Sequence, residues 1–309
     1  MPSLTIVLTV VRGPILGRWS RPTQARCNEL TISGSNDHLD MNEIAPRRRS
    51  PAKFVILVFL LSLPFWLVGA VADEGLPLNL PLSALMFPCP LIAALVLVLR
   101  EEGRDGVRTL LRRTIDHSGI RPRAWYLPTI FLMPSIYLLS FGIQHLMGWP
   151  LHELSGPFLM IPVLFLVFFI TAVGEETGWM GYAADPLQGR RSALETGLIL
   201  GLVWSMWHVV PDIQAGQDWA FIAGQRTFSV LLRVLIVWIY NNTGRSLFAA
   251  VLLHTMDNVS VYSLFPDSDQ YVPAVTAAVT VVVVMVVTAL WGPRTLARYR
   301  FGQAASESV

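Results

Sequence analysis

Residues 161–173, IPVLFLVFFITAV, form an apolar run that is typical of the middle of a membrane-spanning helix. The stretch that follows, GEETGWMGYAADPLQ at 174–188, begins with two adjacent carboxylates, Glu175 and Glu176. A charge within the hydrocarbon core is costly and is seldom kept without a role. Either these glutamates are solvated at the cytoplasmic end of a helix, or they belong to a functional site inside the membrane.

The composition is that of a polytopic membrane protein. Of the 309 residues, 53% are hydrophobic and 14% are charged, whereas about 25% of residues are charged in soluble domains. The net charge is +2 and the basic residues are spread over several loops, so nothing resembles the concentrated basic face of a nucleic-acid-binding protein. Cys27 and Cys89 supply neither a disulfide framework nor a metal-binding spacing.

Apolar segments long enough to cross a membrane recur along the chain. About 20 residues of helix cross a hydrocarbon core of about 30 Å, and this length predicts an all-α bundle of about eight transmembrane helices. We place the spans near residues 54–72, 80–99, 125–143, 160–183, 193–211, 220–240, 246–263 and 272–291. Prolines in the first three spans predict kinks or re-entrant pieces, because each removes a backbone donor; they are Pro64, Pro88, Pro90 and Pro134.

Basic residues alternate from one connection to the next. They precede the first span and follow the second, fourth, sixth and eighth spans: Arg47, Arg48, Arg49 and Lys53; Arg100, Arg104, Arg108, Arg112, Arg113, Arg121 and Arg123; Arg190 and Arg191; Arg245; and Arg294, Arg298 and Arg300. The other connections contain Asp or Glu and neither Lys nor Arg. Because short basic loops stay cytoplasmic, both termini are predicted to be cytoplasmic.

The predicted transmembrane domain covers residues 54–300, between a cytoplasmic tail at 1–53 and a C-terminal tail at 301–309. The apolar stretch TIVLTVV near the N-terminus is too short to span, and no cleavage site follows it. Met41 opens MNEIAPRRRSPAKF, a plausible start with a basic flank. Residues 1–40 are therefore expected to be either an upstream extension of the gene model or a disordered tail.

Other predicted spans also carry polar residues. His208 lies in GLVWSMWHVVP, while His254 and Asn258 lie in FAAVLLHTMDN, four residues apart and hence on one helix face. Counted from the predicted cytoplasmic ends, the depths are roughly 12 Å for Glu175 and His254, 18 Å for Asn258 and 22 Å for His208. The four side chains are expected to converge in one layer, although each taken singly is explained by hydrogen bonding between packed helices.

Two adjacent glutamates followed by GW and GY, then WxxWH, then HxxxN, stand in this order on three predicted helices. This pattern resembles the CAAX-type prenyl endopeptidase and bacteriocin-processing family of intramembrane proteases, the ABI or CPBP family. The resemblance covers about residues 120–265, which would form the protease-like core. It implies an eight-helix bundle with an active site in a cavity open to membrane and cytoplasm.

The resemblance also implies roles for individual residues. Glu175 would be the general base that activates a water, His208 would assist it, and His254 with Asn258 would hold the oxyanion. Glu176 would have a supporting role. The implied substrate is a peptide or protein, lipidated or not, that a multi-pass plasma-membrane enzyme cleaves near the lipid bilayer; no nucleic acid is involved. Lys53 is the only lysine, an arginine preference that points to a high-GC bacterial genome.

Met180 departs from the family pattern, because the usual motif, EExxxR, has an arginine at this position. The lost arginine would have been a partner for Glu176 or an anchor for substrate. Arg226 and Arg233 are seven residues apart, on roughly one face of the sixth predicted helix, and are candidates to supply the missing charge. Snorkelling to lipid headgroups is the alternative, and a supporting role in the interior is preferred for Arg233.

A metal-dependent mechanism is the first alternative. Zinc would accept an O/N ligand set of Glu175, His208 and His254, with Glu176 beside them. The HExxH signature is absent, however: after His152 and Glu153, its second histidine is replaced by Gly156, in a predicted outer loop. No cofactor is therefore preferred.

Two non-enzymatic alternatives come from other function classes. A catalytically impaired scaffold of the same family, which binds a partner without cleaving it, is supported by Met180 and opposed by the presence of all four proposed catalytic residues. A transporter is less favoured, because the sequence shows no inverted repeat.

Overall fold

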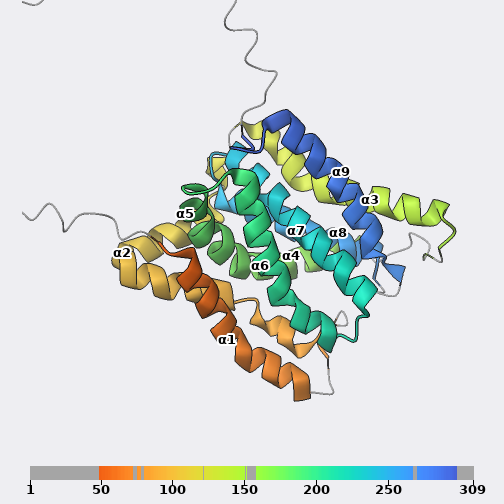
Figure 1. The fold of residues 1–309 in the computed structure, drawn as a ribbon, viewed down its shortest axis with the longest axis horizontal. Helices are drawn as coiled ribbons and strands as arrows, with labels where there is room; N and C mark the ends of the chain where they lie inside the picture. The colour runs from red at the N-terminus through yellow and green to blue at the C-terminus, as the bar shows by residue number, and fades with distance from the viewer. Residues whose placement is uncertain are drawn as a thin grey trace, which may run out of the picture. The chain divides into compact units, whose positions relative to one another are not determined.

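The computed structural model describes residues 49–71, 75–77, 80–120, 122–149, 151, 158–266 and 270–297 (Figure 1). Within these ranges the chain is almost entirely helical, apart from turns and one isolated bridge between Leu76 and Leu80. Three predictions fall outside the described residues. They concern the tails at 1–48 and 301–309, the alternative start at Met41, and the His152–Glu153 pair.

Eight helices in the described part of the chain are long and apolar enough to cross a membrane, which confirms the predicted multi-pass α-helical fold. They are α1 (Pro51–Val71), α2 (Cys89–Ile115), α3 (Tyr126–Leu146), α4 (Ile161–Gly178), α6 (Ala193–Gln214), α7 (Trp219–Asn242), α8 (Leu247–Leu264) and α9 (Pro273–Trp291). The short elements are η2 (Leu82–Met86), η3 (His117–Gly119), η4 (Arg123–Trp125), η5 (Phe158–Met160), η6 (Trp179–Ala184) and α5 (Asp185–Gln188).

The second span differs most from its prediction. The arginine-rich segment expected to be a loop after residue 99 instead continues α2 to Ile115, with one non-helical residue, Gly103, at φ 73°. Glycine has no Cβ and adopts this positive φ without strain, so the helix resumes after the break. Pro88 and Pro90 lie at the start of α2 rather than within it, where a missing N–H costs no intrahelical hydrogen bond.

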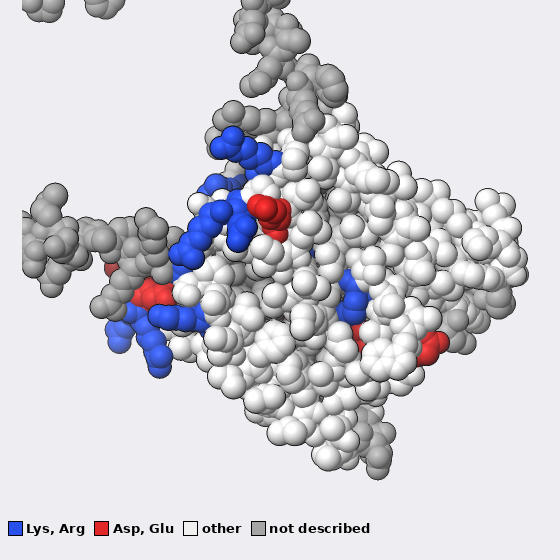
Figure 2. All heavy atoms as spheres, viewed as in Figure 1, with Lys and Arg blue, Asp and Glu red and all other residues white. Residues whose placement is uncertain are grey.

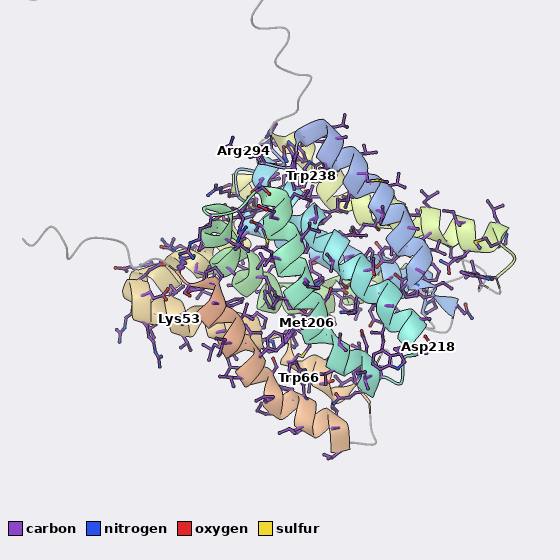
Figure 3. All side chains as sticks on the ribbon, in the orientation of Figure 1. Lys53, Trp66, Met206, Asp218, Trp238 and Arg294 are labelled. Atoms are coloured by element: carbon purple, nitrogen blue, oxygen red, sulfur yellow. The ribbon has the colours of Figure 1, made fainter. Side chains whose placement is uncertain are left out.

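The ends of the bundle differ in charge. Figure 2 shows basic side chains gathered near α2, α5 and the beginning of α1, while most of the viewed face is uncharged. Lys53 and Arg294, labelled in Figure 3, lie toward this end, and Asp218 lies toward the opposite end. The orientation of the bundle in the membrane, with both termini cytoplasmic, stays a prediction.

Helices α6 and α7 pack closely against each other because two glycines of α6 face the backbone of α7. A Cβ at Gly197 would lie 2.9 Å from Cα of Val234, and a Cβ at Gly201 would lie 2.8 Å from the carbonyl oxygen of Val230. Small residues of this kind allow membrane helices to approach closely. The contact joins the first half of α6 to the middle of α7, next to the candidate site.

We expect Gly201→Ala to lower the stability of the protein by about 1–3 kcal/mol, because the added methyl group meets backbone that cannot move aside. The measurement is the midpoint of thermal unfolding in detergent. Gly142→Ala in α3 is the matched control, since a Cβ there has no neighbour within 4 Å. Equal midpoints for the two variants would contradict the close α6–α7 contact.

Candidate active site

Glu175 and Glu176 lie in the last turn of α4, and both side chains are buried. The alternative that they are solvated at a helix end is therefore wrong. The helix continues from Trp179 to Ala184 as a π-helical turn, η6, rather than as the uniform α-helix predicted for 160–183. π-Helical turns inside α-helices occur frequently at functional sites.

Among the described residues, the Glu175 carboxylate accepts a single hydrogen bond. Nε1 of Trp204 donates to its Oε2 at 2.7 Å, and Nε2 of His208 lies 4.0 Å from the same oxygen. The other ring nitrogen of His208, Nδ1, donates to the backbone carbonyl of Trp204 at 2.9 Å. This bond fixes the imidazole so that Nε2 points to Glu175 without touching it.

Glu176, in contrast, uses both carboxylate oxygens. Nη1 of Arg233 donates to Oε2 at 2.6 Å, and Nδ1 of His254 donates to Oε1 at 2.8 Å. The Glu176 and Arg233 side chains are completely buried, and that of His254 is almost so. A buried carboxylate needs such partners, because an unpaired charge in this environment would be strongly destabilising.

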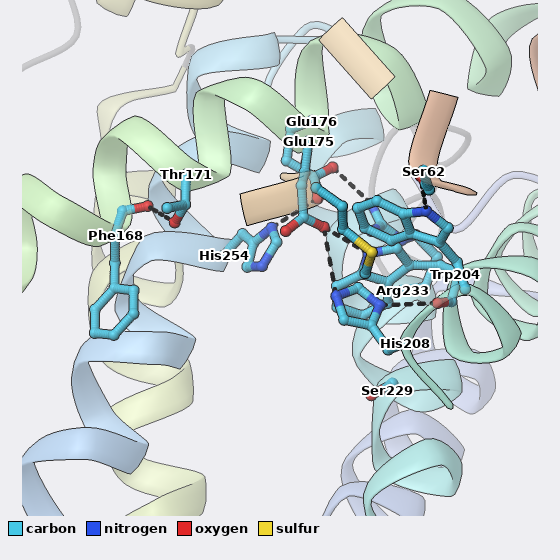
Figure 4. Close-up of polar contacts among 12 residues, drawn as sticks. Ser62, Phe168, Thr171, Glu175, Glu176, Trp204, His208, Ser229, Arg233 and His254 are labelled. Carbon is cyan, nitrogen blue, oxygen red and sulfur yellow. Dashed lines mark hydrogen bonds and ion pairs between the residues drawn. The ribbon is translucent and has the colours of Figure 1, made fainter. Parts of the chain in front are cut away.

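Trp204 joins the two halves of the cluster. Its ring lies 4.3 Å from the guanidinium carbon of Arg233, and its ring centroid is 5.0 Å from that of His208 and 5.3 Å from that of His254. Figure 4 shows His254 on one side of the two glutamates, with Trp204, His208 and Arg233 on the other. Helices α4, α6, α7 and α8 thus each contribute to one cluster.

The structure places Asn258 differently from the other predicted residues. It lies one turn beyond His254 on α8, is half-buried, and has no side-chain hydrogen bond among the described residues. Its neighbour Asp257, which the sequence analysis did not single out, is buried and accepts a hydrogen bond from Tyr137 of α3 at 3.0 Å. Its position in the middle of a predicted span could have identified Asp257 as a candidate site residue, because a carboxylate there is costly and seldom kept without a role.

Met180 is completely buried in η6, so the motif position faces the protein interior. The cation bound to Glu176 comes instead from Arg233, on another helix. Snorkelling to headgroups is therefore wrong for Arg233. Arg226 is also partly buried and forms an ion pair with Asp212.

We expect Met180→Arg to give no gain in activity and to lower the unfolding midpoint, because both oxygens of Glu176 already have partners and a second buried cation would be uncompensated. The rate of hydrolysis per folded molecule and the unfolding midpoint are the two measurements. Higher activity at unchanged stability would show instead that Met180 limits catalysis.

The acidic and histidine side chains of the cluster are the candidate ligands for a metal ion. In the described ranges, no group of three or more His, Cys, Asp or Glu side chains is arranged to hold one. Of the four ligands considered for zinc, Glu176 has both oxygens bound, by Arg233 and His254. His254 uses Nδ1 for this bond and keeps Nε2 available, as metal-binding histidines commonly do. The zinc alternative with Glu175, His208 and His254 is therefore one that a chelator experiment has to test.

Two comparisons relate the chain to known proteins. Residues 157–260 match the family model for Type II CAAX prenyl endopeptidase Rce1-like proteins. CAAX prenyl protease 2 of Methanococcus maripaludis is 26% identical over 238 residues, which cover 70% of this chain and 86% of that protein. The matched family segment contains every residue of the cluster described above.

Proposed function

The chain belongs to the CPBP family of membrane proteases, as a relative of the Rce1-like CAAX prenyl endopeptidases, and we propose that it cleaves its substrate with a water molecule activated by Glu175. The observation that carries this proposal is the unequal bonding of the two glutamates. Oε1 of Glu175 has no hydrogen bond among the described residues, and the side chain keeps 9% of its surface exposed. Glu176 has both oxygens occupied and no exposed surface. Only Glu175 can accept a hydrogen bond from water.

The proposed reaction begins with a water that donates to Glu175. The 4.0 Å between Glu175 Oε2 and His208 Nε2 is too long for a direct hydrogen bond and is suited to a bridging water. As the water oxygen attacks the scissile carbonyl carbon, a C–O bond forms, Glu175 takes the proton, and the carbonyl oxygen becomes an oxyanion. Collapse of this intermediate breaks the C–N bond, and the proton passes to the leaving amine.

His254 and Asn258 are the proposed donors to the oxyanion. Nδ1–H of His254 donates to Glu176, which fixes the ring, and His254 is proposed to act as the imidazolium, whose Nε2–H donates to the oxyanion. Asn258 lies one turn away with its amide uncommitted among the described residues. Preorganised donors of this kind contribute about 3–4 kcal/mol to transition-state stabilisation. Glu176 is proposed to orient His254 and to balance its positive charge, and Arg233 to hold the Glu176 carboxylate in place.

The proposed substrate is a protein or peptide that ends in a prenylated C-a-a-X sequence. The support is the name of the curated relative, a CAAX prenyl protease, together with the site's position among helices that lie in lipid. In such a motif the cysteine four residues from the C-terminus carries the prenyl chain, which would hold the substrate at the bilayer. The proposed location is the plasma membrane.

The test is hydrolysis of a fluorogenic peptide panel, with farnesylated and unmodified C-a-a-X peptides, by purified protein with and without a chelator. We expect cleavage of the farnesylated peptides at a rate that the chelator leaves unchanged, because the proposed reaction activates water with Glu175 rather than with a metal ion. Loss of cleavage with the chelator would contradict the metal-free mechanism. Absence of all cleavage by folded protein would contradict the proposed activity.

A further inference from the structure

A second ion pair lies between α6 and α7, nearer to the loop that connects them than the candidate active site is. Asp212 follows His208 by four residues on α6, and Arg226 precedes Arg233 by seven residues on α7, so each lies on nearly the same face of its helix as a residue of the cluster. Nε of Arg226 is 2.9 Å from Oδ2 of Asp212. Both side chains are partly exposed, at 14% for Arg226 and 15% for Asp212.

Among the described residues of α3, α4, α6, α7, α8 and α9, Arg226 is the one Lys or Arg whose side chain keeps exposed surface. In the described structure, helices α3, α4, α6, α8 and α9 contain no Lys or Arg, and α7 contains only Arg226 and Arg233. The Arg233 side chain has no exposed surface and is bound to Glu176. Figure 2 shows basic and acidic atoms together at the surface over α6 and α7, in an otherwise uncharged area.

The hydrogen-bonding capacity of Arg226 is largely unused. A guanidinium has five N–H donors, yet among the described residues this one makes a single hydrogen bond, from Nη2 to Oδ1 of Asp212 at 3.5 Å. Nε of Arg226 lies close to Asp212 but is buried and has no hydrogen-bond acceptor among the described residues. Oδ2 of Asp212 is likewise buried and has no hydrogen-bond donor among them. The two side chains are therefore poorly matched to each other, and Arg226 has donors left for a second carboxylate.

The backbone around Arg226 is tied to the active-site helix. Oγ of Ser205, the residue after Trp204, donates to the carbonyl oxygen of Arg226 at 2.9 Å. The distance between Arg226 and the cluster is thus set by two packed helices rather than by a loop. A binding group held in this way can measure a fixed length of peptide.

That length matches a short peptide. Arg226 precedes Arg233 by seven positions, about 10 Å along the α7 axis, and its partner Asp212 follows His208 by four, about 6 Å along the α6 axis. An extended chain covers about 3.3–3.6 Å per residue, so three residues also span about 10 Å. Any bond inside a four-residue terminal motif lies no more than three residues from the C-terminal carboxylate.

Resting on the proposed function, we infer that Arg226 binds the free C-terminal carboxylate of the substrate, with Asp212 as its internal partner when no substrate is bound. Arg226 would then be the residue that restricts cleavage to bonds close to a C-terminus. Asp212 would compete with the substrate carboxylate and keep the cation paired between turnovers.

The test compares one farnesylated peptide made as the free acid and as the C-terminal carboxamide. We expect the wild type to show a kcat/KM about tenfold to hundredfold higher for the acid, the range for a hydrogen bond to a charged group. In Arg226→Gln the value for the acid should fall to that for the amide, with the amide unchanged. Equal values for the two peptides in the wild type, or equal losses for both in the variant, would overturn the inference.

Asp212→Asn is expected to change the preference for the acid peptide over the amide peptide in the direction opposite to Arg226→Gln. Because it removes the competing carboxylate, it should increase the preference for the acid, whereas an unchanged or smaller preference would contradict the competition. The double variant Asp212→Asn/Arg226→Gln leaves no unpaired charge and keeps the test valid if Arg226→Gln alone does not fold. It should also show no preference for the acid.

Arg104→Gln is the control. Arg104 is an exposed arginine of α2, and its replacement should leave the preference for the acid as in the wild type.

A binding measurement separates this inference from the proposed function. Glu175→Gln protein is titrated with the same two peptides, so no hydrolysis is needed. Tighter binding of the acid that depends on Arg226 supports the inference even if the wild type cleaves neither peptide, in which case the proposed function alone fails. Equal binding of acid and amide, or no binding of either, overturns the inference.

Discussion

Glu175→Gln is expected to reduce kcat/KM by about a hundredfold to ten-thousandfold, the usual contribution of a general base. Glutamine preserves the size of the side chain and can still accept the hydrogen bond from Trp204, but it cannot take a proton from water. The measurement is hydrolysis of the farnesylated peptide per folded molecule. The unfolding midpoint should stay close to that of the wild type.

Thr171→Val is the matched control for this substitution. Thr171 lies one turn earlier on α4, and within the described part of the chain its hydroxyl donates to one acceptor, the carbonyl oxygen of Phe168 in its own helix. Its replacement should leave the rate unchanged. A Glu175→Gln enzyme with the wild-type rate would contradict the role of Glu175, as would an equal loss in Thr171→Val.

Arg233→Met is expected to lower the free energy of unfolding by about 3–5 kcal/mol, the usual cost when one partner of a buried ion pair is removed. The methionine fills part of the same space but leaves the Glu176 carboxylate with His254 as its only partner. A loss of this size is a large fraction of the stability of most proteins. The expected result is a much reduced yield of folded protein and a lower unfolding midpoint.

Two double variants identify the cause of that loss. Glu176→Gln/Arg233→Met removes both charges and should recover much of the stability. Met180→Arg/Arg233→Met moves the cation to the motif position, four residues from Glu176 on the same helix, and should recover part of it. If neither is more stable than Arg233→Met, the ion pair does not account for the loss.

The sequence predicted the eight spans because each is an apolar segment of sufficient length, and helix length in a membrane is set by the thickness of the bilayer. It failed at α2, where arginines after residue 99 suggested a loop. That inference used composition, whereas a helix that emerges from the membrane can continue in a polar environment. Only the break at Gly103 marks the change in direction.

The candidate site could be located by sequence only in part. Polar residues at similar depth indicated which helices meet, but depth estimates put Glu175 and His208 roughly 10 Å apart along the membrane normal, and the structure places their side chains 4.0 Å apart. The depths refer to the backbone, whereas the distance joins side-chain atoms, and the reach of the two long side chains accounts for much of the difference. The Glu176–Arg233 pair joins residues 57 positions apart, and no spacing rule connects them.

The different environments of the two glutamates also required the structure. Adjacent residues on a helix point about 100° apart, so one of the pair had to face a different neighbour from the other. Which one faces Arg233 and His254, and which one keeps a free oxygen, depends on how α6, α7 and α8 pack around α4. The family resemblance assigned Glu175 as the base, and the free oxygen on Glu175 supports that assignment.

The most direct test of the central proposal is a single turnover of the farnesylated peptide in ¹⁸O-labelled water, followed by mass spectrometry of the product and of the protein. If Glu175 activates water that attacks the substrate directly, the new product carboxylate carries one ¹⁸O after the first turnover and Glu175 carries none. An ¹⁸O label in the Glu175 side chain, with an unlabelled first product, would show a covalent acyl intermediate and contradict the account.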